Sequence, residues 1–305
     1  MSQPTSPQPH QADSLLGNFL RFLQRPRYTI KVPTQQAAIA SGSTAIADLL
    51  RLYSLKVIIM LPLMVLQFWV KARLSDVGAI QADSETISLN AFFWYGVVLA
   101  PVLEEIMFRL PLRYSPLNLA LTFCVWSLFI TLTVNLPLPP SQIFVLLVVG
   151  SLLLRLGLKK SIHPKAAHRL YQQWFPVLFY GSVLLFGLAH LTNYNFTTVI
   201  DQAWTLTPLL VLTQIEGGIF LAFIRLQYGF WWAIFAHSFH NAIVLTLLVL
   251  TELSSLDSLL KRQVPTLTSQ EDIILLVLLF FVVDGLILCL STVWGMIQEW
   301  RAELQ

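Results

Sequence analysis

An apolar run over residues 90–112 contains, in its second half, the sequence Ala100-Pro-Val-Leu-Glu-Glu-Ile-Met-Phe-Arg-Leu110. The run is long enough to cross a lipid bilayer as a helix, yet it carries three ionisable side chains. Each of them costs roughly 2.5–3.5 kcal/mol at the centre of a membrane helix on insertion scales. Glu104, Glu105 and Arg109 therefore need partners or a function that offsets this cost.

The composition indicates a membrane protein throughout. Of the 305 residues, 56% are hydrophobic and only 11% are charged, and the mean hydropathy is +0.68. An average soluble domain is about 25% charged. We therefore predict an all-α, polytopic protein that is surrounded by membrane lipid and has no nucleic-acid partner. The two cysteines, Cys124 and Cys289, lie far apart in apolar stretches and indicate neither a disulfide framework nor a metal site.

The apolar stretches predict about eight membrane helices. They cover residues 55–70, 89–112, 117–136, 142–158, 174–191, 206–226, 230–250 and 272–295. Lys and Arg are concentrated in the segments that would share a side with the N-terminus, which predicts cytoplasmic positions for both termini. We expect a multi-pass protein of the plasma membrane, in a bacterium.

Two parts of the chain are distinguished by composition. Residues 1–35 form an N-terminal segment, and its first 14 residues are rich in Pro, Gln and Ser, which predicts disorder. A stripe of apolar residues at helical spacing follows and predicts a helix in the lipid headgroup region, or alternatively one that binds a soluble partner. Residues 36–305 then form a single transmembrane domain.

Further polar residues lie inside the predicted spans. His190 ends the fifth span, and the seventh carries His237, His240 and Asn241. His237 and Asn241 are four residues apart, so they share one face of a helix, and His240 flanks the same face.

The carboxylates of the second span differ in their predicted partners. Glu105 and Arg109 are also four residues apart, in the order that favours an ion pair. Glu104 lies about 100° around the same helix and is left to point elsewhere.

Each of these residues has a structural explanation when taken alone. A histidine near a helix end is commonly a satisfied interfacial group, and an asparagine can join two membrane helices. Glu216 and Asp284 stand alone in their spans and are interpreted as structural or cavity-lining. The set Glu104, His190, His237 and Asn241 is harder to explain in this way, because all four would be costly facing lipid. A shared polar cavity is therefore predicted.

Three spaced motifs in the chain resemble those of a known family. Glu104-Glu105-x-x-x-Arg109, Phe186-x-x-x-His190 and His237-x-x-x-Asn241 are similar in kind and order to the motifs of the CAAX protease and bacteriocin-processing (CPBP) family. These proteins are intramembrane glutamic endopeptidases and include the type II CAAX prenyl endopeptidases. The resemblance implies hydrolysis of a peptide bond in a protein or peptide substrate, with lipidated CAAX proteins among the options, and it implies no cofactor or metal.

The resemblance also implies roles for individual residues. Glu104 and His190 would activate a water molecule, while His237 and Asn241 would bind the oxyanion. Glu105 and Arg109 would support this geometry. His240 receives no role and is interpreted as a packed or cavity-lining histidine. The roles require Glu104 and His190 to meet, although straight helices would hold them apart, so we expect tilted or irregular spans.

The chain departs from the family pattern in one place. Eighty residues separate Arg109 from His190, and they include two predicted spans that the family does not usually have at this point. We interpret residues 117–158 as an inserted helical hairpin. Two further classes stay open: a zinc-dependent membrane protease, although no HExxH is present and Asn is a poor zinc ligand, and a non-catalytic protein such as an immunity-like protein or a transporter.

Overall fold

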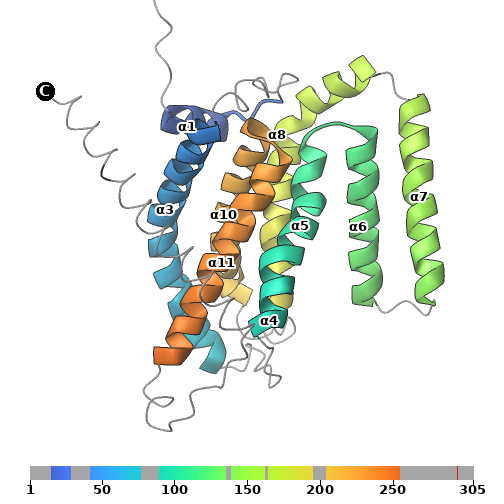
Figure 1. Cartoon of the computed structure of the whole chain (residues 1–305). Helices are drawn as coiled ribbons and strands as arrows, with labels where there is room; N and C mark the ends of the chain where they lie inside the picture. Colours follow the sequence, from blue (N-terminus) through green and yellow to red (C-terminus); the bar gives the residue numbers. More distant parts are fainter. Residues whose placement is uncertain are drawn as a thin grey trace, which may run out of the picture.

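The computed structural model describes residues 15–28, 42–76, 89–134, 139–161, 164–194, 204–254 and Trp294, and all regular structure in these residues is helical (Figure 1). The α-helices are α1 (Leu15–Gln24), α3 (Gly42–Asp76), α4 (Leu89–Phe92), α5 (Ala100–Glu104), α6 (Pro116–Val134), α7 (Pro140–Ser161), α8 (Pro164–Ala189), α10 (Thr207–Gln227) and α11 (Phe230–Ser254). Short segments of other helix types join them: the π-helices η1 (Phe93–Leu99) and η2 (Glu105–Arg109), and the 3₁₀ helices η3 (Leu110–Leu112), η4 (His190–Asn193) and η5 (Trp204–Leu206). The predicted all-α class is confirmed for these residues.

Within the described residues, five helical stretches are long and apolar enough to cross a membrane, which identifies an integral, multi-pass membrane protein. They are Ile46–Gln67, Asn90–Leu112, Ser141–Lys160, Lys165–Asn193 and Trp204–Gln227. The apolar stretch in α6, Pro116–Thr131, is shorter. The predicted eighth span apart from Trp294, and with it Asp284 and Cys289, lies outside the described residues, as do residues 1–14. The orientation of the bundle in the membrane stays a prediction.

Two predicted span boundaries were wrong. The first span was placed at residues 55–70 and the fifth at 174–191, but α3 begins at Gly42 and α8 at Pro164. In both helices the added turns carry exposed charged residues such as Arg51 and Arg169. An apolar window ends where such residues begin, whereas the backbone hydrogen bonds of the helix continue through them.

Helix α10 lies at the centre of the bundle and packs against α3, α8 and α11. Glycines permit the close approach of α8 and α10. A Cβ atom on Gly187 of α8 would lie 2.6 Å from Cγ1 of Ile215, and one on Gly218 of α10 would lie 3.1 Å from the Phe186 ring. Membrane helices gain van der Waals contact through such small residues, because lipid supplies no hydrophobic driving force between them.

The helix predicted after the N-terminal residues is present as α1. Its Phe19 is buried and stacks on Phe220 of α10, with 4.6 Å between the ring centroids. Leu16 and Leu20 point away from this contact and are exposed. One side of α1 is thus bound to the bundle, and its apolar outer side is compatible with the predicted headgroup location.

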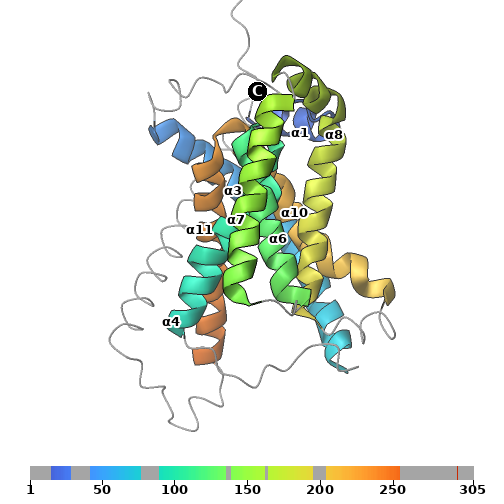
Figure 2. The same cartoon turned by 90° about the vertical axis from the view of Figure 1, so that its right-hand side faces the viewer.

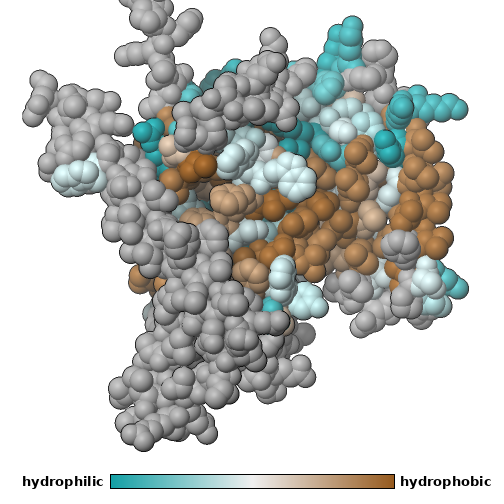
Figure 3. Space-filling view, in the orientation of Figure 1, coloured by the Kyte–Doolittle hydropathy of each residue, from teal (hydrophilic) through white to brown (hydrophobic). Residues whose placement is uncertain are grey.

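Helices α6 and α7 form the hairpin that the sequence predicted between the first two motifs. They pack mainly against each other, and both views of the chain place α7 on the outer side of α6 (Figures 1 and 2). Hydrophobic side chains cover this part of the surface (Figure 3). Figure 3 is consistent with lipid contact along the hairpin.

Candidate active site

The helical stretch that carries Glu104 and Glu105 is irregular on both sides of the short helix α5. The π-helix η1 precedes α5, and η2 begins at Glu105 itself, directly after Glu104. A π-helical segment widens the turn and changes the direction in which neighbouring side chains point, and such segments are frequent at functional sites. The sequence analysis predicted irregular spans, and the span that carries the first motif is irregular.

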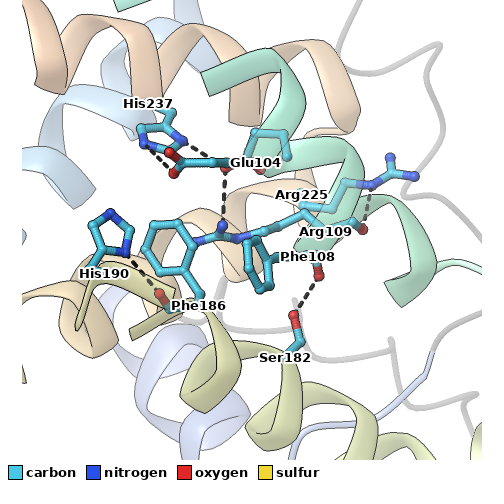
Figure 4. A network of polar contacts seen from close by, with 9 residues as sticks. Glu104, Phe108, Arg109, Ser182, Phe186, His190, Arg225 and His237 are labelled. Atoms are coloured by element: carbon cyan, nitrogen blue, oxygen red, sulfur yellow. Dashed lines mark hydrogen bonds and ion pairs between the residues drawn. The ribbon is translucent and has the colours of Figure 1, made fainter. Parts of the chain in front are cut away.

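Three neighbouring helices bind the backbone of η2 through their side chains. Four successive carbonyl groups each accept one such hydrogen bond: Ile106 from Thr122 Oγ1 (2.9 Å), Met107 from Trp126 Nε1 (3.1 Å), Phe108 from Ser182 Oγ, and Arg109 from Arg225 Nε (3.3 Å). Figure 4 shows the last two. Carbonyl groups left without partners inside a membrane would cost several kcal/mol each. These bonds from α6, α8 and α10 fix the position of the motif.

Glu105 and Arg109 form a buried ion pair. Arg109 Nη1 lies 3.5 Å from Glu105 Oε1, and the exposed fraction of both side chains is 0%. The guanidinium carbon of Arg109 also lies 3.7 Å from the centroid of the Phe186 ring, a cation–π contact. Phe186 begins the second motif, so Arg109 joins the first motif to the second.

His237 contacts both carboxylates of the first motif, and Figure 4 shows it beside Glu104. Its Nδ1 atom is 2.9 Å from Glu105 Oε1, and its Nε2 atom is 3.6 Å from Glu104 Oε2. The sequence had left Glu104 without a partner, whereas the structure brings it close to His237 from the third motif. The second distance is too long for a direct hydrogen bond, but it is a distance that a bridging water molecule can serve.

His190 is held in one orientation by the backbone of its own helix. Its Nδ1 atom lies 2.8 Å from the carbonyl oxygen of Phe186. A carbonyl only accepts hydrogen bonds, so Nδ1 must carry the proton. In the neutral ring, Nε2 then presents an unprotonated lone pair. The Phe186 ring lies against both histidines, with ring centroids 4.8 Å from His190 and 5.9 Å from His237.

Asn241 reaches from α11 to the first π-helix. Its Nδ2 atom donates a hydrogen bond of 2.8 Å to the carbonyl oxygen of Gly96 in η1. A primary amide nitrogen carries two hydrogens, so this bond leaves one donor over.

Each of the three motifs contributes at least one polar residue to the lining of one cavity of about 780 Å³. Its lining includes all four residues to which the resemblance gives a direct catalytic role, Glu104, His190, His237 and Asn241. Glu105 and Arg109, which were expected to support the geometry, are buried behind Glu104 and do not line it. Much of the remaining lining is apolar, with Leu, Met, Phe and Val side chains from α3 and α11 among others.

Three polar residues near this cavity were not predicted to belong together. Lys56 of α3 lines the cavity and lies 3.2 Å from Nδ1 of His240, and it interacts electrostatically with Glu216 of α10. The sequence offers Glu216 no polar partner at helical spacing, because its neighbour Lys56 comes from another helix and no spacing in the sequence reveals it. The sequence did contain one indication of this contact: Lys56 lies inside a predicted span, where a lysine requires a counter-charge or a polar cavity.

The described residues contain no group of three or more His, Cys, Asp or Glu side chains arranged to hold a metal ion. The polar groups of the site are instead joined in a chain of imidazole, carboxylate and guanidinium groups.

The model of one protein family, described as type II CAAX prenyl endopeptidase Rce1-like, matches residues 86–243. The match is continuous over just over half of the chain and includes all three motifs as well as the α6–α7 hairpin. The chain belongs to the Rce1-like family. No curated protein and no solved structure matches the chain. The Rce1-like family is a family of hydrolases within the CPBP group, which agrees with the predicted resemblance.

Proposed function

We propose that this Rce1-like protein is an intramembrane glutamic endopeptidase, with prenylated CAAX proteins as its candidate substrates. The observation that carries the proposal is that Glu104, His190, His237 and Asn241, from three separate helices, border one cavity. Family membership supports the reaction class, and the apolar part of the lining suits a substrate that enters with hydrophobic groups.

In the proposed reaction, Glu104 accepts a proton from a water molecule held between its carboxylate and the Nε2 lone pair of His190. The hydroxide attacks the carbonyl carbon of the scissile peptide bond and forms a tetrahedral oxyanion. The proton then passes to the amide nitrogen as the C–N bond breaks, which releases an amine and a carboxylic acid. A positioned general base contributes about 10²–10⁴-fold to such a reaction.

The donors for the oxyanion come from α11. Asn241 has one amide hydrogen that is not used by the bond to Gly96, and a doubly protonated His237 would donate through Nε2 while Nδ1–H remains on Glu105. Each donor of this kind is worth roughly 2.7–4 kcal/mol of transition-state stabilisation. Glu105 and Arg109 act as positioning residues, because their contacts fix His237 and Phe186.

The test is the Glu104→Gln variant. Membranes that contain the wild-type protein are compared by proteomics with membranes that contain Glu104→Gln, and farnesylated CAAX peptides are assayed with both purified proteins. We expect cleavage with the wild type and a loss of at least about 10²-fold in the variant, since the general base is removed. The side chain of Glu104 is 26% exposed, so the amide should be accommodated and the melting temperature in detergent should change little.

Two results would contradict the mechanism. Full activity of Glu104→Gln would exclude Glu104 as the base. Loss of wild-type activity on treatment with a chelator, followed by its return with Zn²⁺, would favour the metal-dependent alternative instead.

A further inference from the structure

Lys56 places a cation in the wall of the cavity that holds the proposed active site. The residue lies within the apolar span Ile46–Gln67 of α3, and its exposed fraction is only 5%. Its ammonium group lies 3.2 Å and 3.3 Å from the two ring nitrogens of His240 and 3.5 Å from the Met60 sulfur. Among the described residues, no carboxylate lies within 4.0 Å of this ammonium group. A buried ammonium with only neutral groups in direct contact is a site for an anion.

The surroundings hold Lys56 in position. Tyr53, one turn earlier on α3, has its hydroxyl 3.3 Å from Nδ1 of His240, so α3 and α11 are joined by a tyrosine, a histidine and a lysine. Glu216 interacts electrostatically with Lys56, but it does not line the cavity, and neither of its oxygens has a hydrogen-bond partner. Glu216 thus stabilises the positive charge of Lys56 without direct contact. The ammonium stays available to a negatively charged group in the cavity.

The position of Lys56 relative to the catalytic residues limits what the anion can be. His240 lies one helical turn beyond His237, so their Cβ atoms are about 5–6 Å apart. The ammonium and the Glu104–His237 contact therefore border the same cavity, next to neighbouring turns of α11. A CAAX sequence has three residues after its cysteine and ends in a free carboxylate. A terminal carboxylate matches the charge of the Lys56 ammonium, and in such a peptide it lies only three residues from the cysteine.

We propose that Lys56, positioned by His240 and Tyr53, binds the free C-terminal carboxylate of the substrate peptide. The proposal rests on the proposed function, because it takes a C-terminal peptide as the substrate. It makes Lys56 a residue that determines specificity: the enzyme would cut near a chain end, and it would discriminate against the same sequence inside a longer chain. It also gives His240 a function, as a positioning residue for Lys56.

The experiment compares two farnesylated peptides in nanodiscs of neutral phosphatidylcholine. Both end in Cys, two aliphatic residues and Met, one with a free carboxylate and the other with a C-terminal amide. We expect kcat/KM of the wild type to be about ten- to a hundredfold higher for the acid, mainly through KM, as is typical for a charge-assisted hydrogen bond. Lys56→Met should bring the acid-to-amide ratio close to one, and Lys56→Arg should restore most of it. Lys159→Met, at an exposed position of α7, is the matched control and should keep the wild-type ratio.

Two outcomes overturn the proposal. One is a wild-type enzyme that cuts acid and amide equally well. The other is a Lys56→Met variant that loses activity equally on both peptides together with a lower melting temperature, which would make Lys56 only the counter-charge of Glu216.

Binding measurements separate this proposal from the proposed function. Both peptides are titrated onto Glu104→Gln and onto Glu104→Gln with Lys56→Met. Tighter binding of the acid that depends on Lys56 supports the carboxylate site even if no cleavage occurs in any variant, whereas equal binding overturns it. An anionic lipid headgroup could satisfy the same ammonium, so the titration is repeated with phosphatidylglycerol in the nanodiscs. A Lys56 effect that appears only with phosphatidylglycerol would assign the site to lipid and overturn the peptide assignment.

Discussion

His237 Nδ1 lies 2.9 Å from Glu105 Oε1, and both side chains are almost fully buried. A carboxylate in this position fixes the orientation of an imidazole ring, as the aspartate does in the catalytic triad of serine proteases. The ring of His237 then faces Glu104 with its other nitrogen. The two neighbouring glutamates of the first motif therefore differ in their surroundings: Glu105 is part of the packed interior, and Glu104 faces the cavity.

This difference predicts that the same substitution at the two adjacent positions has different effects on stability. Glu105→Gln removes the counter-charge of Arg109, whose exposed fraction is 0%. Breaking a buried ion pair by removing one partner typically costs about 3–5 kcal/mol. We expect a clear fall in the melting temperature of Glu105→Gln in detergent, accompanied by a loss of activity.

Glu104→Gln is the matched control for this measurement, because it should lose activity at a melting temperature close to that of the wild type. Equal melting temperatures for Glu105→Gln and the wild type would show that the ion pair is not needed for stability.

Arg109→Lys should be destabilising although it conserves the charge. Lysine has no planar group to stack on the Phe186 ring, which lies 3.7 Å from the guanidinium carbon of Arg109. A desolvated cation–π contact is worth about 2 kcal/mol. We expect a loss of that size in the free energy of unfolding. Arg155→Lys, at an exposed position of α7, is the control for the same chemical change and should leave the melting temperature within error of the wild type. A similar result for both variants would exclude the contact as a source of stability.

The site could be predicted from the sequence to the extent that its residues share a helix. The spacing of Glu105 and Arg109 predicted their ion pair, and apolar length identified the helices that carry the motifs. The partners of Glu104 and Lys56 come from other helices, and spacing along one helix holds no information about them. The family resemblance supplied part of this missing information about contacts between helices, because it implied that the three motifs meet.

The irregular backbone around the first motif was only partly predictable. The need for a distorted span followed from the distance between Glu104 and His190 in straight helices. The distortion consists of two π-helical segments, and each is bound by side chains from other helices. The carbonyls of η2 accept hydrogen bonds from α6, α8 and α10, and Gly96 O of η1 accepts one from α11. These are tertiary contacts, and the local sequence does not encode them.

The contact between Tyr228 and Asp48 predicts a loss of stability in alkaline solution. Tyr228 lies between α10 and α11, and its hydroxyl donates a hydrogen bond of 3.1 Å to Asp48 Oδ2. Burial raises the pKa of Tyr228, and the neighbouring Asp48 carboxylate raises it further. The unfolded chain, with a tyrosine pKa of about 10, therefore loses the proton first. Stability should be fully present below pH of about 10 and should fall as the pH rises above it toward the pKa of the folded state.

Melting temperatures in detergent between pH 8 and 11 test this expectation. Tyr228→Phe should lower the melting temperature at pH 8, because a hydrogen bond worth about 1 kcal/mol is lost, and should reduce the slope above pH 10. Tyr95→Phe removes the hydroxyl of an exposed tyrosine and should leave both unchanged. Equal alkaline slopes for Tyr228→Phe and the wild type would assign the loss to other tyrosines.

Asn241 gives the sharpest distinction between a structural and a catalytic amide. Its bond to Gly96 O joins α11 to η1, so Asn241→Ala should cost about 1 kcal/mol of stability whatever else the residue does. If its second amide hydrogen also binds the oxyanion, kcat should fall by about 10²–10³ while KM stays nearly constant, since the donor acts only in the transition state. Thr246→Val is the matched control on α11, because Thr246 is buried and its hydroxyl donates to Ala242 O within the same helix. The control should lose stability with an unchanged kcat, and an equally small effect of Asn241→Ala on kcat would restrict Asn241 to joining the two helices.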